Sequence, residues 1–147
     1  MKKFINILVI GLGLLGIVLS NINGHFNPPF SIFWTPIVLT IIIAGVNYPL
    51  YKTDFTKTII YNYGLLLFND LFIRFYAGGT HDQEGKGWIF LFFSIAFIMA
   101  TITMLFYAYS VRQVSVTNVK SKRNNFLTII ISAITTGFVY MLLIADI

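Results

Sequence analysis

Cysteine is absent from this 147-residue chain, and charged residues make up only 10% of it. Without cysteine there is no disulfide, no thiolate metal site and no thiol nucleophile. Ordinary soluble domains carry about 25% charged residues, so the shortage of charge and the mean hydropathy of +0.82 exclude a soluble domain. Hydrophobic residues instead make up 57% of the chain. This composition predicts a protein whose main solvent is lipid.

Charge is missing altogether from four long stretches of the sequence. These stretches are residues 4–20, 30–51, 88–111 and 126–145. About 20 apolar residues in a helix cross a ~30 Å hydrocarbon layer, so all four are long enough to span, the first only just. A fifth stretch, residues 58–77, is similar in length but contains Asp70 and Arg74. We therefore predict one all-α domain over residues 1–147, a membrane helix bundle with about five transmembrane helices.

The basic residues predict how this bundle is oriented, because cytoplasmic loops are enriched in Lys and Arg. Five spans with a cytoplasmic amino terminus leave only Lys86 outside. The basic residues then inside are Lys2, Lys3, Lys52, Lys57, Arg112, Lys120, Lys122 and Arg123. If residues 58–77 stayed on one side, Lys52 and Lys57 would be separated from some of the other basic residues. The charges therefore favour five spans, with the carboxyl terminus outside.

Tyrosine and tryptophan are enriched at both membrane surfaces, which gives a second indication of topology. Near the predicted outer boundary lie Trp34, Trp88, Tyr76 and Tyr140. Near the predicted inner boundary lie Tyr48, Tyr51, Tyr61, Tyr63, Tyr107 and Tyr109. The aromatic residues thus predict the same five-span topology as the basic residues.

An alternative for the amino terminus is a cleaved signal peptide, because Lys2 and Lys3 precede an apolar run that ends in small residues near Ser20. The run is longer than the ~7–15 residues of a typical signal core, which favours a retained span. In both cases residues 21–29 face outward, so the rest of the topology is unchanged.

The third span carries the most informative residues. At 100° per residue, its polar side chains Asn62, Asn69, Asp70 and Arg74 share one arc. The opposite arc contains Gly64, Leu67, Phe68, Leu71 and Phe75. A charge in hydrocarbon costs roughly 2.5–3.5 kcal/mol on insertion scales, so Asp70 and Arg74 should face protein and, at i,i+4 spacing, pair with each other. The pair either locks helices together or belongs to a functional site.

The predicted outer loop, residues 78–87, follows this span directly. Its titratable residues are His81, Asp82, Glu84 and Lys86. The loop has neither an EF-hand pattern nor a His-Glu-x-x-His motif, so we predict no metal site and no cofactor. The plain interpretation is a solvated loop, and the functional one is a contact surface for an outer partner or part of a proton relay.

The predicted inner loop, residues 112–125, is basic. Arg112, Lys120, Lys122 and Arg123 should contact anionic lipid headgroups, at about 1 kcal/mol each, or a cytoplasmic partner. The positive-inside bias explains these charges, so nucleic-acid binding is not expected.

Membrane-enzyme chemistry finds little support in the residues. Only two histidines are present, Gly-x-Ser-x-Gly is missing, and Asp70 is the one carboxylate well inside a predicted span. Transport is harder to dismiss because intramembrane ion pairs often mark ion pathways. Against transport, Pro36 and Pro49 lie near the ends of their span, where they should bend or cap it. Small residues four apart, such as Gly16 and Ser20, predict close helix contacts.

We therefore expect, first, a non-enzymatic interaction or scaffold subunit with a polar extracytoplasmic face around residues 69–87. Its partners would be membrane lipids and other membrane subunits or further copies of itself. A small-solute, ion or proton pathway through Asp70 and Arg74 comes second, and a lipid-acting membrane enzyme third. Compact size and composition suggest the cytoplasmic membrane of a bacterium.

Overall fold

The computed structural model describes residues 2–53, 55–76, 83–114 and 119–144, and these form an all-α bundle. The all-α helix bundle predicted from composition is therefore confirmed. In chain order its elements are α1 (Lys2–Phe26), α2 (Pro28–Ile41), the π-helical segment η1 (Ile42–Val46), α3 (Tyr48–Thr53), α4 (Phe55–Phe75), α5 (Gln83–Val114) and α6 (Val119–Leu143).

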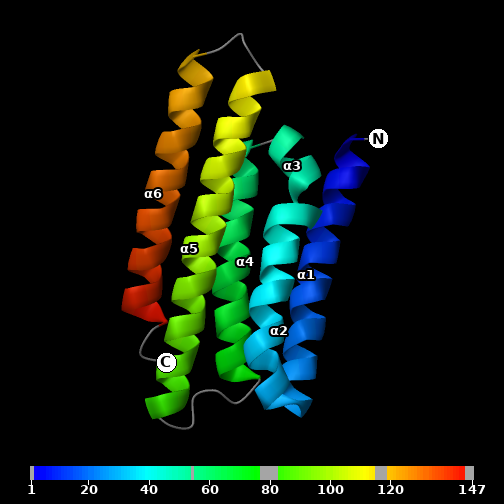
Figure 1. Ribbon diagram of the computed structural model, residues 1–147, viewed down its shortest axis with the longest axis vertical. Helices are drawn as coiled ribbons and strands as arrows, with labels where there is room; N and C mark the ends of the chain where they lie inside the picture. The colour runs from blue at the N-terminus through cyan, green and yellow to red at the C-terminus, as the bar shows by residue number, and fades with distance from the viewer. Residues whose placement is uncertain (1, 54, 77–82, 115–118, 145–147) are drawn as a thin grey trace.

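The long helices run alternately up and down (Figure 1). The start of α1, the short helix α3, the start of α4, the end of α5 and the start of α6 lie at one end, which we call the basic end because α3 and α4 carry Lys52 and Lys57 there. The turn from α1 to α2, the end of α4 and the end of α6 lie at the other end, which we call the opposite end. This alternation is what five consecutive crossings require.

Four segments are long and apolar enough to cross a membrane, so the chain is a multi-pass membrane protein by length and composition. They are Phe4–Phe26, Phe33–Lys52, Gly85–Ser110 and Asn125–Leu142. Helix α4 is not among them, although its 21 residues extend for about 31 Å and run alongside the other helices (Figure 1). Its asparagines and charged residues reduce its apolar character, and the structure compensates for them by packing.

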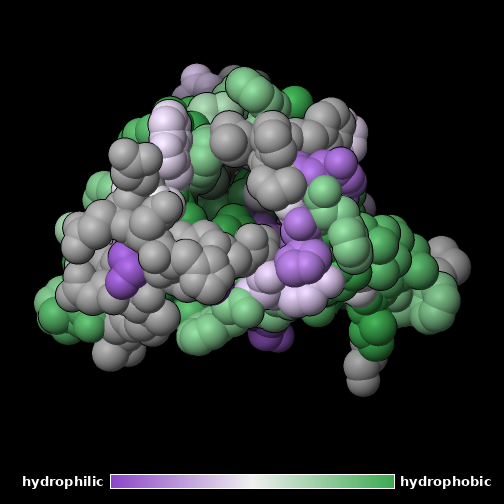
Figure 2. All heavy atoms as spheres, turned by 90° about the horizontal axis from the view of Figure 1, so that it is seen from below, coloured by the Kyte–Doolittle hydropathy of each residue, from purple (hydrophilic) through white to green (hydrophobic). Residues whose placement is uncertain are grey.

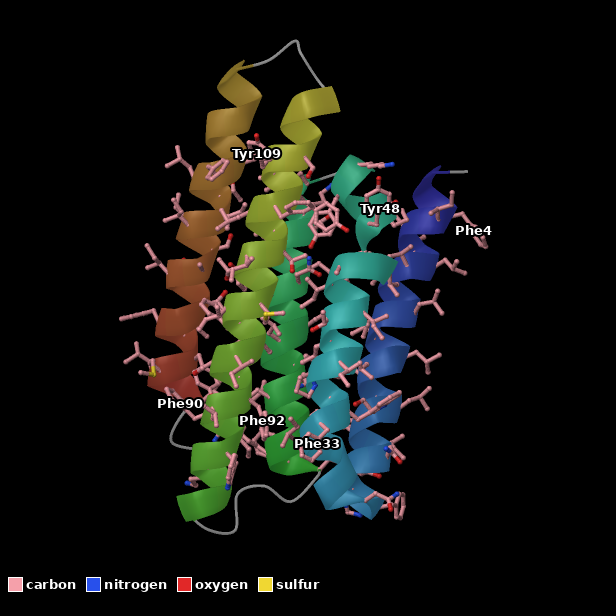
Figure 3. The ribbon with its side chains drawn as sticks, viewed as in Figure 1. Phe4, Phe33, Tyr48, Phe90, Phe92 and Tyr109 are labelled. Atoms are coloured by element: carbon pink, nitrogen blue, oxygen red, sulfur yellow. The ribbon has the colours of Figure 1, made fainter. Side chains whose placement is uncertain are left out.

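Helix α4 is well enclosed: nine of its 21 residues are buried, and it contacts α1, α3, α5 and α6. The four apolar spans are mostly exposed on the surface of the bundle, since no more than 28% of each is buried. Large hydrophobic side chains such as Phe4 and Phe33 are more than two-thirds exposed, and Phe4 points away from the bundle (Figure 3). Figure 2, which shows the molecule from its opposite end, shows hydrophobic side chains along the flanks of the bundle. Such a surface suits lipid, while the polar helix lies inside.

Helices extend through most of the predicted loops. Residues 21–29 were expected to be an outer loop, but within them only Asn27 lies outside a helix, because α2 begins directly at Pro28. Proline suits the first turn of a helix, where its missing N–H is not needed. Residues 52–57, which separate the second and third predicted spans, are helical except for residue 54, which is not described. Residues 83–87 of the predicted outer loop belong to α5.

The second span is interrupted, which the sequence analysis did not anticipate. Helix α2 passes into the π-helical η1, where the amide of Asn47 donates to the carbonyl of Ile42 at 3.0 Å, and α3 follows. Pro49 has no N–H to donate. In a continuous α-helix its ring would clash with the carbonyl four residues earlier, that of Gly45. The proline therefore interrupts the helix within the span instead of only capping it.

Candidate functional site: the buried polar face of α4

The lipid-facing and protein-facing arcs predicted for the third span match the observed exposure of α4. Gly64, Phe68 and Phe75 are exposed, and Leu67 and Leu71 are half-buried. The predicted polar residues of the other arc are all buried, namely Asn62, Asn69, Asp70 and Arg74. Helical periodicity was sufficient for this result because it determines the direction in which each side chain points.

The centre of the polar face is a hydrogen-bonded group of three side chains, Asp70, Arg74 and Tyr140. Arg74 Nε donates to Asp70 Oδ2 at 2.7 Å, across one turn of α4. The hydroxyl of Tyr140, on α6, accepts from Arg74 Nη2 at 3.0 Å and donates to Asp70 Oδ1 at 3.3 Å. The two charged side chains are at most 2% exposed. The predicted pair therefore exists, and it connects α4 to α6.

Tyr140 is itself held by α5. Its ring stacks on that of Phe93, with centroids 3.7 Å apart and planes 2° from parallel. Stacked rings restrict rotation of the tyrosine, which keeps its hydroxyl directed at the ion pair. The sequence analysis assigned Tyr140 to the outer aromatic belt, but the residue is 2% exposed and serves as a partner of the charges.

Asn69 connects α4 to α1. Its Oδ1 accepts a hydrogen bond of 2.9 Å from Asn21 Nδ2, and both side chains are buried. Nearby, the hydroxyls of Ser20 and Thr35 are 3.3 Å apart and join α1 to α2. Asn21 was expected to lie in a loop, where it would need no partner, so this contact could not be predicted.

Asn62 connects α4 to the interruption of the second span. It accepts from Asn47 Nδ2 through Oδ1, and its Nδ2 donates to the hydroxyl of Tyr51 at 2.7 Å. That hydroxyl in turn donates to the carbonyl of Ile43 at 3.2 Å. Tyr107 on α5 donates to the neighbouring carbonyl of Ala44. Two tyrosines thus satisfy carbonyls of η1, as a helix break inside a membrane requires.

Tyr63 completes the set of contacts by joining α4 to α5. Its hydroxyl lies 2.9 Å from that of Thr101. Asn47 retains one buried acceptor, Oδ1, that has no hydrogen-bond partner within the described residues. The polar groups of α4 therefore reach α1, the interruption of the second span, α5 and α6.

The predicted cluster is divided into two groups along α4. Asn62 and Asp70 lie about 12 Å apart along the helix axis at 1.5 Å per residue. Between them, Leu65 and Leu66 are no more than 2% exposed. Apolar side chains thus separate the Asn62 group from the Asp70 group.

For most of the other predicted site residues the structure does not describe the side chain. His81 and Asp82 lie outside the described residues. The helices α5 and α6 contain Glu84, Arg112, Lys120, Lys122 and Arg123, whose side chains are not described. Lys86 is half-buried in the first turns of α5. Within the described part of the chain, no three His, Cys, Asp or Glu side chains lie together as metal ligands would.

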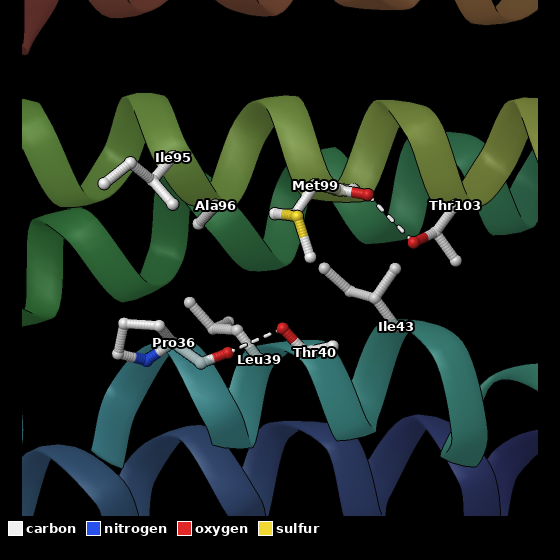
Figure 4. Close-up of a pocket in the computed structure, with 9 residues that line it drawn as sticks. Pro36, Leu39, Thr40, Ile43, Ile95, Ala96, Met99 and Thr103 are labelled. Atoms are coloured by element: carbon white, nitrogen blue, oxygen red, sulfur yellow. Dashed lines mark hydrogen bonds between the residues drawn. The ribbon is translucent and has the colours of Figure 1, made fainter. Parts of the chain in front are cut away.

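A small cleft lies between the second span and α5 (Figure 4). It holds about 20 Å³, room for roughly one water molecule. Its lining includes Pro36, Thr40, Ala96, Met99 and Thr103. The hydroxyls of Thr40 and Thr103 donate to carbonyls of their own helices at 2.8 Å, so the cleft offers no free polar group from these residues.

Comparisons of the chain with protein-family models, with curated proteins and with solved structures found no match.

Proposed function

We propose that this chain is a non-enzymatic membrane subunit whose bundle is a rigid frame for contacts with other membrane proteins. The observation that carries the proposal is the buried group of Asp70, Arg74 and Tyr140. Hydrogen bonds join all three side chains to one another. Because Tyr140 lies on α6 and the charge pair on α4, the group holds these two helices together.

The rest of the polar face supports the same role. Asn62, Tyr63 and Asn69 have hydrogen-bond partners on neighbouring helices of the same chain. Buried polar networks with satisfied members specify one arrangement of helices. The proposed frame would present its polar outer region, residues 69–87, to a partner, with the basic end in the cytoplasm of a bacterial cell.

Native mass spectrometry after gentle detergent extraction tests this proposal. We expect the chain to be extracted with a second subunit or as an oligomer. The triple variant His81→Ala, Asp82→Asn, Glu84→Gln should lose that mass while its helical circular dichroism and melting temperature stay unchanged. Thr56→Ala, an exposed position at the basic end, is the matched control. A monomeric wild-type chain, or a triple variant that keeps its partner, would contradict the proposal.

A small-solute, ion or proton pathway is the second candidate. The interrupted second span favours it, because η1 and the spare acceptor of Asn47 bring polar atoms into the membrane interior. Against it, Leu65 and Leu66 separate the two polar groups. A pathway predicts flux in proteoliposomes that Asp70→Asn abolishes while the protein stays folded. A scaffold predicts no flux in either variant.

A further inference from the structure

The short helix α3, at the basic end, carries an exposed tyrosine and an exposed lysine in contact. Lys52 Nζ lies 4.2 Å from the centroid of the Tyr48 ring, at i,i+4 spacing on one face of the helix. The Tyr48 side chain is 45% exposed. Figure 3 shows Tyr48 at this end of the bundle. The two residues therefore present a cation and an amphipathic ring together.

The polar groups of Tyr48 and Lys52 are available to a ligand as far as the described part of the chain shows. Among the described residues, the Lys52 ammonium has no carboxylate partner and the Tyr48 hydroxyl has no hydrogen-bond partner. An ammonium offers three donors and a phenol one. The patch thus provides several donors and a positive charge.

The patch is held in place by aromatic packing. Tyr48 lies 5.7 Å from Tyr107, and Tyr107 stacks on the buried Tyr51 at 4.2 Å between centroids. The hydroxyls of Tyr107 and Tyr51 are bound to the carbonyls of η1. Lys52 therefore rests on a fixed platform, which lowers the entropy that a ligand would have to remove.

The patch also lies at the depth where lipid headgroups are found. The apolar span Phe33–Lys52 ends at this lysine. Tyrosines with one polar tip prefer the boundary between hydrocarbon and water, and each Lys near an anionic surface contributes about 1 kcal/mol. The geometry points to Tyr48 and Lys52 as a binding site for the phosphate group of an anionic phospholipid.

This site is independent of the proposed scaffold role, because it requires only that the basic end lie at a membrane surface. The ammonium pairs with the phosphate oxygens, and the Tyr48 hydroxyl donates to one of them. The acyl chains remain beside the apolar span. A free phosphate has the same headgroup chemistry but lacks these chains, so its binding would be much weaker.

Lipid titration followed by native mass spectrometry tests the site. The purified protein is titrated with phosphatidylglycerol, and with phosphatidylcholine for comparison. We expect preferential retention of phosphatidylglycerol, and an apparent affinity about 5-fold lower for Lys52→Gln. Tyr48→Phe should lower it less, because only the hydroxyl is lost. Lys57→Gln removes the same charge from the same end, outside the Tyr48 platform, and should change it little.

Circular dichroism and melting temperature confirm that each variant is folded, as expected for exposed positions. Inorganic phosphate is added as a competitor to test whether a free phosphate binds the same site. It should neither raise the melting temperature nor displace phosphatidylglycerol at equal concentration. Unchanged lipid affinity in Lys52→Gln, an equal loss in Lys57→Gln, or displacement by inorganic phosphate would each overturn the inference. None of these results depends on whether a partner subunit exists.

Discussion

At the scale of single residues, the bundle depends on a charge pair whose partners cannot be separated cheaply. Asp70 and Arg74 are buried together, and Tyr140 contacts both. Removing one member leaves the other charge buried without its counter-ion, which costs about 3–5 kcal/mol. Replacing both members by apolar side chains removes both buried charges, and only the Tyr140 hydroxyl then loses its two partners.

We therefore expect Asp70→Leu and Arg74→Met each to destabilise the bundle by about 3–5 kcal/mol, and the double variant to recover most of that loss. Unfolding in a titration with a denaturing detergent, followed by circular dichroism, measures the free energy of unfolding. Additive losses in the double variant would show that the two residues do not act as a pair.

Tyr140→Phe is a milder test of the same group. The substitution keeps the ring stacked on Phe93 and removes only the hydroxyl that bonds both charges. Hydrogen bonds to charged groups contribute about 1.5–3 kcal/mol each, with compensation lowering the total. We expect a loss of about 2 kcal/mol in the same unfolding experiment, and little change for Tyr48→Phe, whose side chain is 45% exposed.

At the scale of helices, close approach decides how α1 packs on its neighbours. A Cβ at Gly13 would lie 2.5 Å from the Tyr61 hydroxyl oxygen, and a Cβ at Gly16 would lie 3.1 Å from Ile42 Cδ1. That hydroxyl donates to the carbonyl of Ile10 at 2.8 Å, so the ring cannot move without losing the bond. Gly16, one of the small residues predicted to permit close helix contacts, does so here within one chain, whereas the sequence analysis did not single out Gly13.

Gly13→Ala should therefore destabilise the packing of α1 against α4 by about 1–3 kcal/mol, the usual cost of overpacking. Adding Tyr61→Phe should restore part of that stability, because it removes the atom that clashes. Gly11→Ala is the matched control, since a Cβ there meets no atom within 4 Å and alanine favours helix. Melting temperatures of these three variants and of the unsubstituted chain test the contact. If Tyr61→Phe restores no stability to Gly13→Ala, the proposed contact is refuted.

The aromatic residues near the span ends have two different roles, although the sequence assigned them all to the membrane surfaces. Trp34, Trp88, Tyr48 and Tyr109 are exposed near the ends of the spans, as belt residues should be. Tyr51, Tyr63 and Tyr140 are buried and bind other helices. Position near a span end does not separate these roles, because the same amphipathic side chain suits a headgroup or a buried acceptor.

At the scale of the whole molecule, sidedness is the feature that every proposed contact surface depends on. The structure places the start of α1 and Lys52 at one end, and the end of α4 at the other (Figure 1). Because the chain has no cysteine, single introduced thiols report sidedness without background.

We expect Asn23→Cys and Thr80→Cys to react with an impermeant thiol reagent added from outside, and Thr53→Cys and Asn118→Cys to react only after the membrane is opened. Helical dichroism of each variant confirms the fold. The reverse pattern would invert the orientation. Reaction of Thr53→Cys and Thr80→Cys from the same side would mean that α4 does not cross.

The sequence alone determined the class of protein and the inward face of α4. Hydropathy, span length and the 100° helical period are local properties, and each is read from neighbouring residues. The Asp70/Arg74 pairing followed in the same way, because the two residues lie one turn apart on a single helix.

Only the tertiary structure decided which partner each polar residue meets. Asn69 binds Asn21, Asn62 binds Asn47, and Asp70 binds Tyr140, all across different helix pairs. Periodicity gives the direction of a side chain on its own helix but does not identify the helix opposite, and residues 48 or 70 positions apart have no local pattern in common. The interruption at η1 is stable for the same reason: hydroxyls from Tyr51 and Tyr107 reach its carbonyls only after the bundle has assembled.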